Sequence, residues 1–228
     1  MNFENAKRPV VDDRPIDALL AAYAARTLPA PLEALVESHL EMKAENRGYV
    51  ATLEAASGVF LTDVEPLPLI GRDRRLVNIF AMRESGEDGS HRPTAFPVAD
   101  RVPLLPVALR RYLGRELDEL AWQTVASGIE QSIIAEGSFG VASLLRCRPG
   151  KRLRMHGHTG LEAILVITGS FTDQQGRHQA GDIAVADESC IHQPVVAGDS
   201  ELICFMVSED KVQPHGPISR MLEQIFGR

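Results

Sequence analysis

The sequence has few cysteines and no long apolar run, and each shortage removes a class of protein. Its three cysteines, Cys147, Cys190 and Cys204, lack CxxC spacing, so neither a disulfide framework nor a cysteine-based zinc cluster is indicated. No apolar run approaches the roughly 20 residues that cross a bilayer, and the charged start MNFENAKR lacks the apolar core of a signal peptide. We therefore expect a cytoplasmic protein with no membrane partner.

Basic charge is also in short supply. The chain has 24 Lys and Arg against 31 Asp and Glu, a formal net charge of −7, and no dense basic tract. Binding to a phosphate backbone depends on clustered cationic groups, so we expect no direct nucleic-acid binding. The 228 residues suffice for one large domain or two small ones.

Helical periodicity runs through the first eighty residues. The first apolar stripe, Ile16 to Tyr23, ends at the LPAP segment, residues 28–31. A second stripe covers residues 32–40, a third covers residues 49–56 with Gly58 as a stop signal, and a fourth lies at residues 76–80. Helices this short are unstable alone in water, so we expect a small helical bundle over residues 1–82.

The composition then changes, and the period falls from 3.6 to 2. Residues 83–99 are rich in Gly, Ser, Pro and charge, which predicts a linker. In the segment GVASLLRCR, Leu145 and Cys147 share one face of a strand and Ala142 and Leu144 share the other. Further strands are predicted in IEQSIIA, EAILVITGSFTD, DIAVAD and ELICFMVS, and a final helix over residues 218–226. We therefore predict a β-sandwich or barrel over residues 100–228, and an α+β fold class for the whole chain.

Two histidines and a glutamate stand just before an apolar run in GKRLRMHGHTGLEAILVITG, residues 150–169. His156 and His158 share one face of a strand, and Glu162 comes alongside if the chain turns before it. A remote histidine, His192, follows the next strand candidates. Two strand histidines, a carboxylate and a distant histidine are a common ligand set for a divalent metal. We predict a metal site from these four residues; the alternative is that the histidines are structural.

The spacing of these residues is identified as that of the cupin superfamily. Gly150, His156, His158, Glu162 and Gly169 match the first cupin motif at each step. The second motif keeps Gly181 and His192 at the right spacing, while Asp187, Ser189 and Val196 replace its Pro, Gly and Asn. The resemblance implies a double-stranded β-helix, or jelly roll. Four protein ligands complete a tetrahedral zinc site, but the same set also suits iron, manganese or nickel with two waters.

A helical unit joined to a cupin with this ligand set resembles the ChrR family of anti-sigma factors. Residues 16–58 look like that family's anti-sigma domain and residues 144–195 look like its cupin. The resemblance implies a transcription regulator whose helical domain sequesters an extracytoplasmic-function sigma factor. It also implies a cupin that binds zinc through His156, His158, Glu162 and His192 and responds to oxidative stress.

One departure from the family is clear in the helical unit. The family's N-terminal domain carries zinc through an upstream histidine and an HxxxCxxC motif, of which only His39 remains here. Lys43 and Asn46 occupy the cysteine positions, and Arg14 lies near the position of the upstream histidine. A lysine must lose its proton before it can donate to a metal. We therefore predict no zinc in the helical unit.

The helices also offer apolar side chains to a sigma factor, although each of these also fits the core of a bundle. They are Leu19, Leu20, Tyr23, Leu35, Leu40, Tyr49, Val50 and Leu53. A different interpretation of the chain is a metal-dependent cupin enzyme of the dioxygenase type, or a cupin that binds a small molecule. Cys147 and Cys190 are conceivable oxidation targets, but a cysteine in a cupin strand is more often inert packing.

Overall fold

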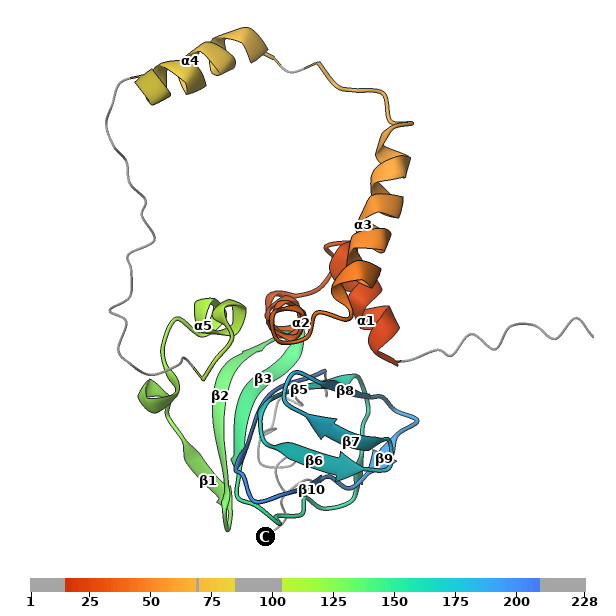
Figure 1. Ribbon diagram of the computed structural model, residues 1–228, viewed down its shortest axis with the longest axis vertical. Helices are drawn as coiled ribbons and strands as arrows, with labels where there is room; N and C mark the ends of the chain where they lie inside the picture. Colours follow the sequence, from red (N-terminus) through yellow and green to blue (C-terminus); the bar gives the residue numbers. More distant parts are fainter. Residues whose placement is uncertain (1–14, 69, 85–103, 210–228) are drawn as a thin grey trace, which may run out of the picture. The chain divides into compact units, whose positions relative to one another are not determined.

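The computed structural model describes residues 15–68, 70–84 and 104–209. Its helices are α1 (Pro15–Ala24), α2 (Ala30–Met42), α3 (Arg47–Leu61), α4 (Arg72–Glu84) and α5 (Val107–Leu113), followed by a short 3-10 turn at Leu117–Glu119 (Figure 1). None of the helices in these ranges is long and apolar enough to cross a bilayer. The predicted α+β order, helices first and strands after, is confirmed.

The strands form a sandwich of antiparallel sheets. The large sheet has the order β1-β2-β3-β11-β5-β8, and a smaller one has the order β10-β6-β7. The strands of the large sheet are β1 (Gln123–Ala126), β2 (Ile129–Gly137), β3 (Gly140–Cys147), β5 (Glu162–Thr168), β8 (Ile183–Ala186) and β11 (Leu202–Ser208). The smaller sheet contains β6 (Ser170–Asp173), β7 (Gly176–Gln179) and β10 (Val195–Val196), and β4 (His156–Gly157) pairs with β9 (Ile191–His192).

The strands β3, β11, β5 and β8 of the large sheet are buried on both faces, which explains their near-continuous apolar sequences. Leu145 and Cys147 of β3 belong to a cluster between the sheets, together with Val166 and Phe171. Ala142 and Leu144, on the opposite face of β3, belong to a second cluster that includes side chains of α1, α2 and α5. The side chains along residues 141–147 were predicted to alternate between two faces, and in the structure the two faces contact two different hydrophobic clusters. Helices on the outer face let a strand carry apolar side chains in both directions.

The contacts of the described residues group into two compact units, whose limits differ from the domain limits predicted at residues 82, 83–99 and 100; those limits stay a prediction. Of the described residues, 15–55 and 104–209 form one unit, and 56–68 and 70–84 form the second. The physical reason is that α1 and α2 pack on β8, β5 and β11 and on α5, so the first helices share a core with the sandwich. Residues 85–103, which hold most of the predicted linker, lie outside the described residues.

Several elements differ from the sequence prediction. Helix α3 does not stop at Gly58 but continues to Leu61, because a glycine costs a helix only about 1 kcal/mol. The helix α5 and the strands β1, β7, β9 and β10 were not predicted, since most are too short for a periodic pattern. The strand predicted at His156 is β4, which ends at Gly157 and does not include His158. The segment EAILVITGSFTD divides into β5 and β6 at Gly169. The predicted final helix at residues 218–226 lies outside the described part of the chain.

The glycines that begin and end the first motif provide a matched test of backbone strain. Both Gly150 and Gly169 have a positive φ, +71° and +74°, but only Gly169 is crowded: a Cβ there would lie 2.6 Å from the carbonyl oxygen of Glu201. We expect Gly150→Ala to cost about 1 kcal/mol and Gly169→Ala about 2–4 kcal/mol in free energy of unfolding. Urea denaturation measures both. Equal losses would show that crowding at Glu201 has no effect.

Candidate metal centre

The structure brings the four predicted donors into one cluster. His156 lies in β4 directly opposite His192 in β9, and Glu162 is the first residue of β5. His158 lies between β4 and β5. One ligand atom from each of the four residues falls within 4.8 Å of all the others. His158, Glu162 and His192 are buried, at 8%, 2% and 2% exposure, so the cluster is shielded from water on most sides.

The distances between donor atoms fit a single cation. The Nε2 atom of His192 lies 2.9 Å from Nε2 of His158 and 3.1 Å from Nε2 of His156. Oε2 of Glu162 lies 3.6 Å from His158 Nε2 and 3.7 Å from His192 Nε2. Donors about 2.05 Å from a tetrahedral zinc are about 3.3 Å from each other, and adjacent donors of an octahedral ion are about 3.0 Å apart. The observed distances bracket both values, so the residues fit a divalent metal of either geometry.

The protonation of two histidines supports the same conclusion. Nδ1 of His156 lies 2.8 Å from the carbonyl oxygen of Arg154, and Nδ1 of His192 lies 3.1 Å from Oδ2 of Asp173. A carbonyl or an ionised carboxylate only accepts, so each Nδ1 carries a proton, and in the neutral ring each Nε2 has a lone pair. In that form two lone pairs face each other across 3.1 Å. A cation between them turns this repulsion into coordination.

Asp173 is a functional candidate that the sequence reasoning missed. Its side chain is 1% exposed, and it accepts from His192 Nδ1 and from the backbone N–H of Gln175. Burial alone would raise the pKa of this carboxyl, but hydrogen bonds from His178, His192 and Gln175 lower it below its usual value, so the carboxylate is ionised. An aspartate in the turn-like segment FTDQQG gives no sequence signal for this role. Only the β6–β7 hairpin brings it to His192.

We expect Asp173→Asn to weaken metal binding about 10- to 100-fold, because an amide no longer fixes the proton of His192 on Nδ1. The side chain keeps its shape, so the fold should be retained. Competition with a chromophoric chelator measures the metal affinity. An unchanged affinity would mean that Asp173 has no part in orienting His192.

Comparison with known proteins identifies the family. Residues 112–212 match the model of the ChrR cupin-like domain. The chain is 32% identical to the anti-sigma-E factor ChrR of Cereibacter sphaeroides over 210 residues, which cover 92% of this chain and 95% of that protein. The chain belongs to the ChrR family of anti-sigma factors.

The structural comparison agrees with the sequence match. The crystal structure of Rhodobacter sphaeroides SigE in complex with the anti-sigma ChrR aligns with a TM-score of 0.67 and 32% identity, and covers 84% of this chain and 96% of that one. KdgF from Halomonas sp. is also similar, with a TM-score of 0.37 and 26% identity over 42% of this chain and 91% of that one. The ChrR match therefore extends over both the helices and the sandwich.

The side chains at the positions of the expected N-terminal zinc motif, His39, Lys43 and Asn46, form polar contacts within the protein. His39 is 2% exposed, and burial lowers its pKa, so the ring is neutral. Lys43 forms its short ion pair with Asp182, 2.6 Å away, and lies 3.6 Å from Glu45. Asn46 contacts the ring of His39. The three side chains at the positions of the family motif are thus engaged with protein partners.

Most of the apolar residues proposed as sigma contacts lie in the core of this family member. Leu19, Leu20, Tyr23, Leu35 and Val50 are buried, with at most 9% exposure. Their periodicity marks the inward face of each helix, and in this conformation that face packs within the first unit. Leu40 and Leu53 are half-buried, and Tyr49 is 40% exposed.

The cysteines have none of the environment that activates a thiol. Cys147 and Cys204 are buried, and burial raises the pKa of Cys147 to about 12 and that of Cys204 well above its usual value. Burial also raises the pKa of Cys190, and the nearby carboxylates add to this effect. A thiolate is the reactive form of cysteine. These positions therefore fit packing residues better than oxidation targets.

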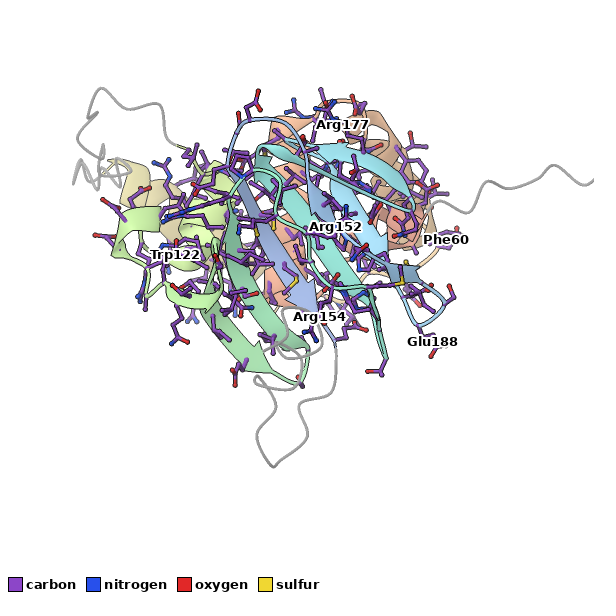
Figure 2. All side chains as sticks on the ribbon, turned by 90° about the horizontal axis from the view of Figure 1, so that it is seen from below. Phe60, Trp122, Arg152, Arg154, Arg177 and Glu188 are labelled. Carbon is purple, nitrogen blue, oxygen red and sulfur yellow. The ribbon has the colours of Figure 1, made fainter. Side chains whose placement is uncertain are left out.

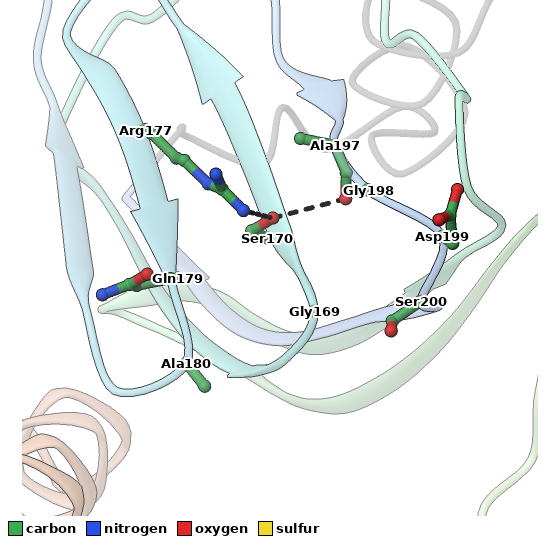
Figure 3. A pocket seen from close by; sticks show the side chains of 9 residues that line it. All are labelled: Gly169, Ser170, Arg177, Gln179, Ala180, Ala197, Gly198, Asp199 and Ser200. Carbon is green, nitrogen blue, oxygen red and sulfur yellow. Dashed lines mark hydrogen bonds between the residues drawn. The ribbon is translucent and has the colours of Figure 1, made fainter.

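A surface cavity of about 320 Å³ lies away from the metal donors, beside β6, β7 and the turn after β10 (Figure 3). Arg177 donates to Ser170 Oγ at 3.3 Å, and Ser170 Oγ donates to the carbonyl of Ala197 at 3.3 Å. Asp199 lines the same cavity. Arg177, Ser170 and the carbonyl of Ala197 are thus engaged with one another, and none of the four metal donors lines this space.

Proposed function

We propose that this chain is an anti-sigma factor that sequesters an extracytoplasmic-function sigma factor, with a zinc-binding cupin that senses oxidative stress. Because a sigma factor acts at RNA polymerase, the proposal places the chain in the cytoplasm, without direct contact to nucleic acid. The observation that carries the sigma-binding part is an exposed apolar segment in a member of this family. The four-donor cluster of the cupin carries the sensing part.

The exposed apolar segment, residues 59–80, contains ten of the fifteen large apolar side chains exposed in the described residues. They are Val59, Phe60, Leu61, Val64, Leu67, Ile70, Leu76, Val77, Ile79 and Phe80. Phe60, near the end of α3, is 75% exposed and is labelled in Figure 2. Soluble chains rarely leave so many large apolar side chains uncovered within one short segment. A protein partner that buries them would supply the missing core, and the related ChrR forms a crystallised complex with SigE.

The metal centre suits a regulator better than an enzyme. Four protein donors complete a tetrahedral zinc site, whereas a catalytic zinc keeps one position for water. When bound, zinc would supply a fixed link between β4, β5 and β9, through His156, Glu162 and His192. A signal that displaces or alters one donor breaks this link. It changes sigma binding only insofar as it favours the released form over the bound one.

Binding of the purified full-length chain to each extracytoplasmic-function sigma factor of its host tests the proposed function. We expect one of these sigma factors to form a one-to-one complex with a Kd below about 1 µM, and to lose promoter-specific transcription in the complex. If none binds, the anti-sigma function is wrong. Metal analysis tests the cupin separately: zinc is expected, whereas iron with exchangeable water would favour the enzyme interpretation.

A further inference from the structure

The C-terminal end of α2 is held against the turn before β8 by a set of polar contacts that we call the α2 latch: His39, Lys43 and Asn46 with Gly181 and Asp182. Lys43 Nζ donates to Oδ1 of Asp182 at 2.6 Å. His39 Nδ1 lies 2.6 Å from the carbonyl oxygen of Gly181, and His39 Nε2 lies 2.8 Å from the amide nitrogen of Asn46. Since the carbonyl only accepts, Nδ1 donates to it and Nε2 accepts from Asn46. Both ring nitrogens are thus satisfied in the neutral form.

The backbone at Gly181 allows the helix to come this close. Its φ is +88°, and a Cβ at this position would lie 2.7 Å from Cγ of Lys43 and 3.2 Å from Cβ of Met42. Asp182 is fixed in turn, because its Oδ2 accepts from the backbone N–H of Gln179 at 2.8 Å. The latch is therefore a close contact between two preorganised partners. Lys43 and Asp182 are only 19% and 27% exposed, so solvent screens their attraction less than it would a surface pair.

The turn that α2 contacts leads into β8, and β8 pairs with β5, the strand that carries the metal donor Glu162. The backbone N–H of Gly181 donates to the carbonyl of Val166 in β5, and the N–H of Val166 donates to the carbonyl of Asp182. Four residues earlier in β5, Glu162 pairs with Ala186 of β8. The latch and this donor thus lie at opposite ends of one strand pair, about 13 Å apart along the chain. Residues 162–167 and 183–186 are all buried, which leaves the pair little freedom to absorb a shift at either end.

We propose that the α2 latch couples the metal centre to the N-terminal helices through α2. Metal binding then tightens α2 against the sandwich, and release of α2 weakens metal binding. The inference rests on the proposed function, in which the cupin holds the metal and the helical segment holds the sigma factor. Metal binding fixes the Glu162 end of the strand pair, and the latch fixes its other end. Such coupling is reciprocal, since each event changes the affinity of the other by the same factor.

Hydrogen exchange of the full chain, with and without zinc, tests the coupling directly. We expect the backbone amides of α2 to exchange about tenfold faster after the metal is removed, because a weakened latch lets the helix open locally. The exchange of α4, which lies in the other compact unit, serves as the internal reference. Its rates should be the same in both states.

Variants of the ion pair test the reverse direction. Lys43→Met and Asp182→Asn keep the shape of each side chain and remove its charge. Each is expected to weaken zinc affinity about five- to tenfold, and the double variant no more than either single one, because all three lack the same pair. Arg26→Met is the matched control. Arg26 pairs with Glu33 and Glu54 within the helical segment and should leave zinc affinity unchanged.

The outcomes separate this inference from the function on which it rests. A wild-type chain that binds no divalent metal overturns both the metal centre and the coupling. A chain that binds zinc, but whose α2 exchange does not depend on zinc, overturns the coupling alone, as does wild-type zinc affinity in both single variants. Failure to bind any sigma factor overturns the anti-sigma function and leaves the coupling in place.

Discussion

Replacing His192 with alanine is expected to lower zinc affinity at least about a hundredfold. Nε2 of this residue lies within 3.7 Å of the donor atoms of His156, His158 and Glu162, so its loss opens the middle of the cluster. Structural zinc sites bind with about 10–16 kcal/mol, or roughly 3 kcal/mol for each of four ligands, and each 1.4 kcal/mol is tenfold in affinity. Competition with a chelator of known zinc affinity measures the change.

The matched control for His192→Ala is Cys190→Ser. Cys190 lies two residues before His192 and is not one of the four clustered donors. Its serine variant should keep the zinc affinity of the wild type, since the thiol is protonated and only half-buried. A His192→Ala chain that retained wild-type affinity would contradict the assignment of the metal centre. A large loss in Cys190→Ser would instead add the thiol to the site.

The same substitution should remove the stabilising effect of zinc on the fold. Zinc binds the folded chain and stabilises it by RT ln(1 + [L]/Kd), about 4 kcal/mol at a thousandfold excess over Kd. Adding zinc to the metal-free wild type should therefore raise its Tm by several degrees. The His192→Ala chain should show little of this rise at the same zinc concentration.

Introducing aspartate at Phe60 or Phe80 is expected to weaken sigma binding about 30-fold or more. These rings are 75% and 61% exposed in the free chain, and a partner that covers them would have to bury a charge without a counter-ion. Burial of an unpaired polar group and loss of an aromatic contact each cost about 2 kcal/mol or more. Titration of the labelled sigma factor with each variant measures the Kd.

The control for these substitutions is Leu104→Asp, an apolar side chain of 50% exposure outside the segment 59–80. It should leave the Kd near the wild-type value. Because Phe60 and Phe80 are exposed, their aspartate variants should also unfold at the wild-type urea concentration. Wild-type sigma affinity in both variants would place the sigma contact elsewhere in the chain.

The metal donors are the part of the molecule that short-range pattern revealed best. His156, His158 and Glu162 lie within seven residues, and the strand period already places the two histidines on one face. The role of Asp173 was not predicted, because its partner His192 is 19 residues away and only the β6–β7 hairpin brings the two together. The ion pair of Asp182 was not predicted for the same reason, since Lys43 is 139 residues away. A sequence pattern reveals contacts between residues that are close along the chain, but not contacts between residues that only the fold brings together.

For the N-terminal helices, the sequence predicted the elements but not what their apolar faces contact. Periodicity identified the apolar faces of α1, α2 and α3 but could not say whether a face meets its own chain or another one. Leu19, Leu20 and Leu35 turn inward in the structure, whereas Phe60 and Phe80 remain outside. Both groups look alike in the sequence, because burial depends on which elements pack together rather than on the side chain itself.

The sequence by itself determined the class of fold and the likeness to the ChrR family and predicted the four metal donors, because the apolar period, the motif spacing and the ligand chemistry can be read from the residue order alone. The tertiary structure decided how these parts are joined. It placed α1 and α2 on the sandwich instead of in a separate bundle, turned Lys43 and His39 toward the turn before β8, and set Asp173 behind His192. Contacts between distant segments depend on the packing of whole elements, and only the folded chain specifies that packing.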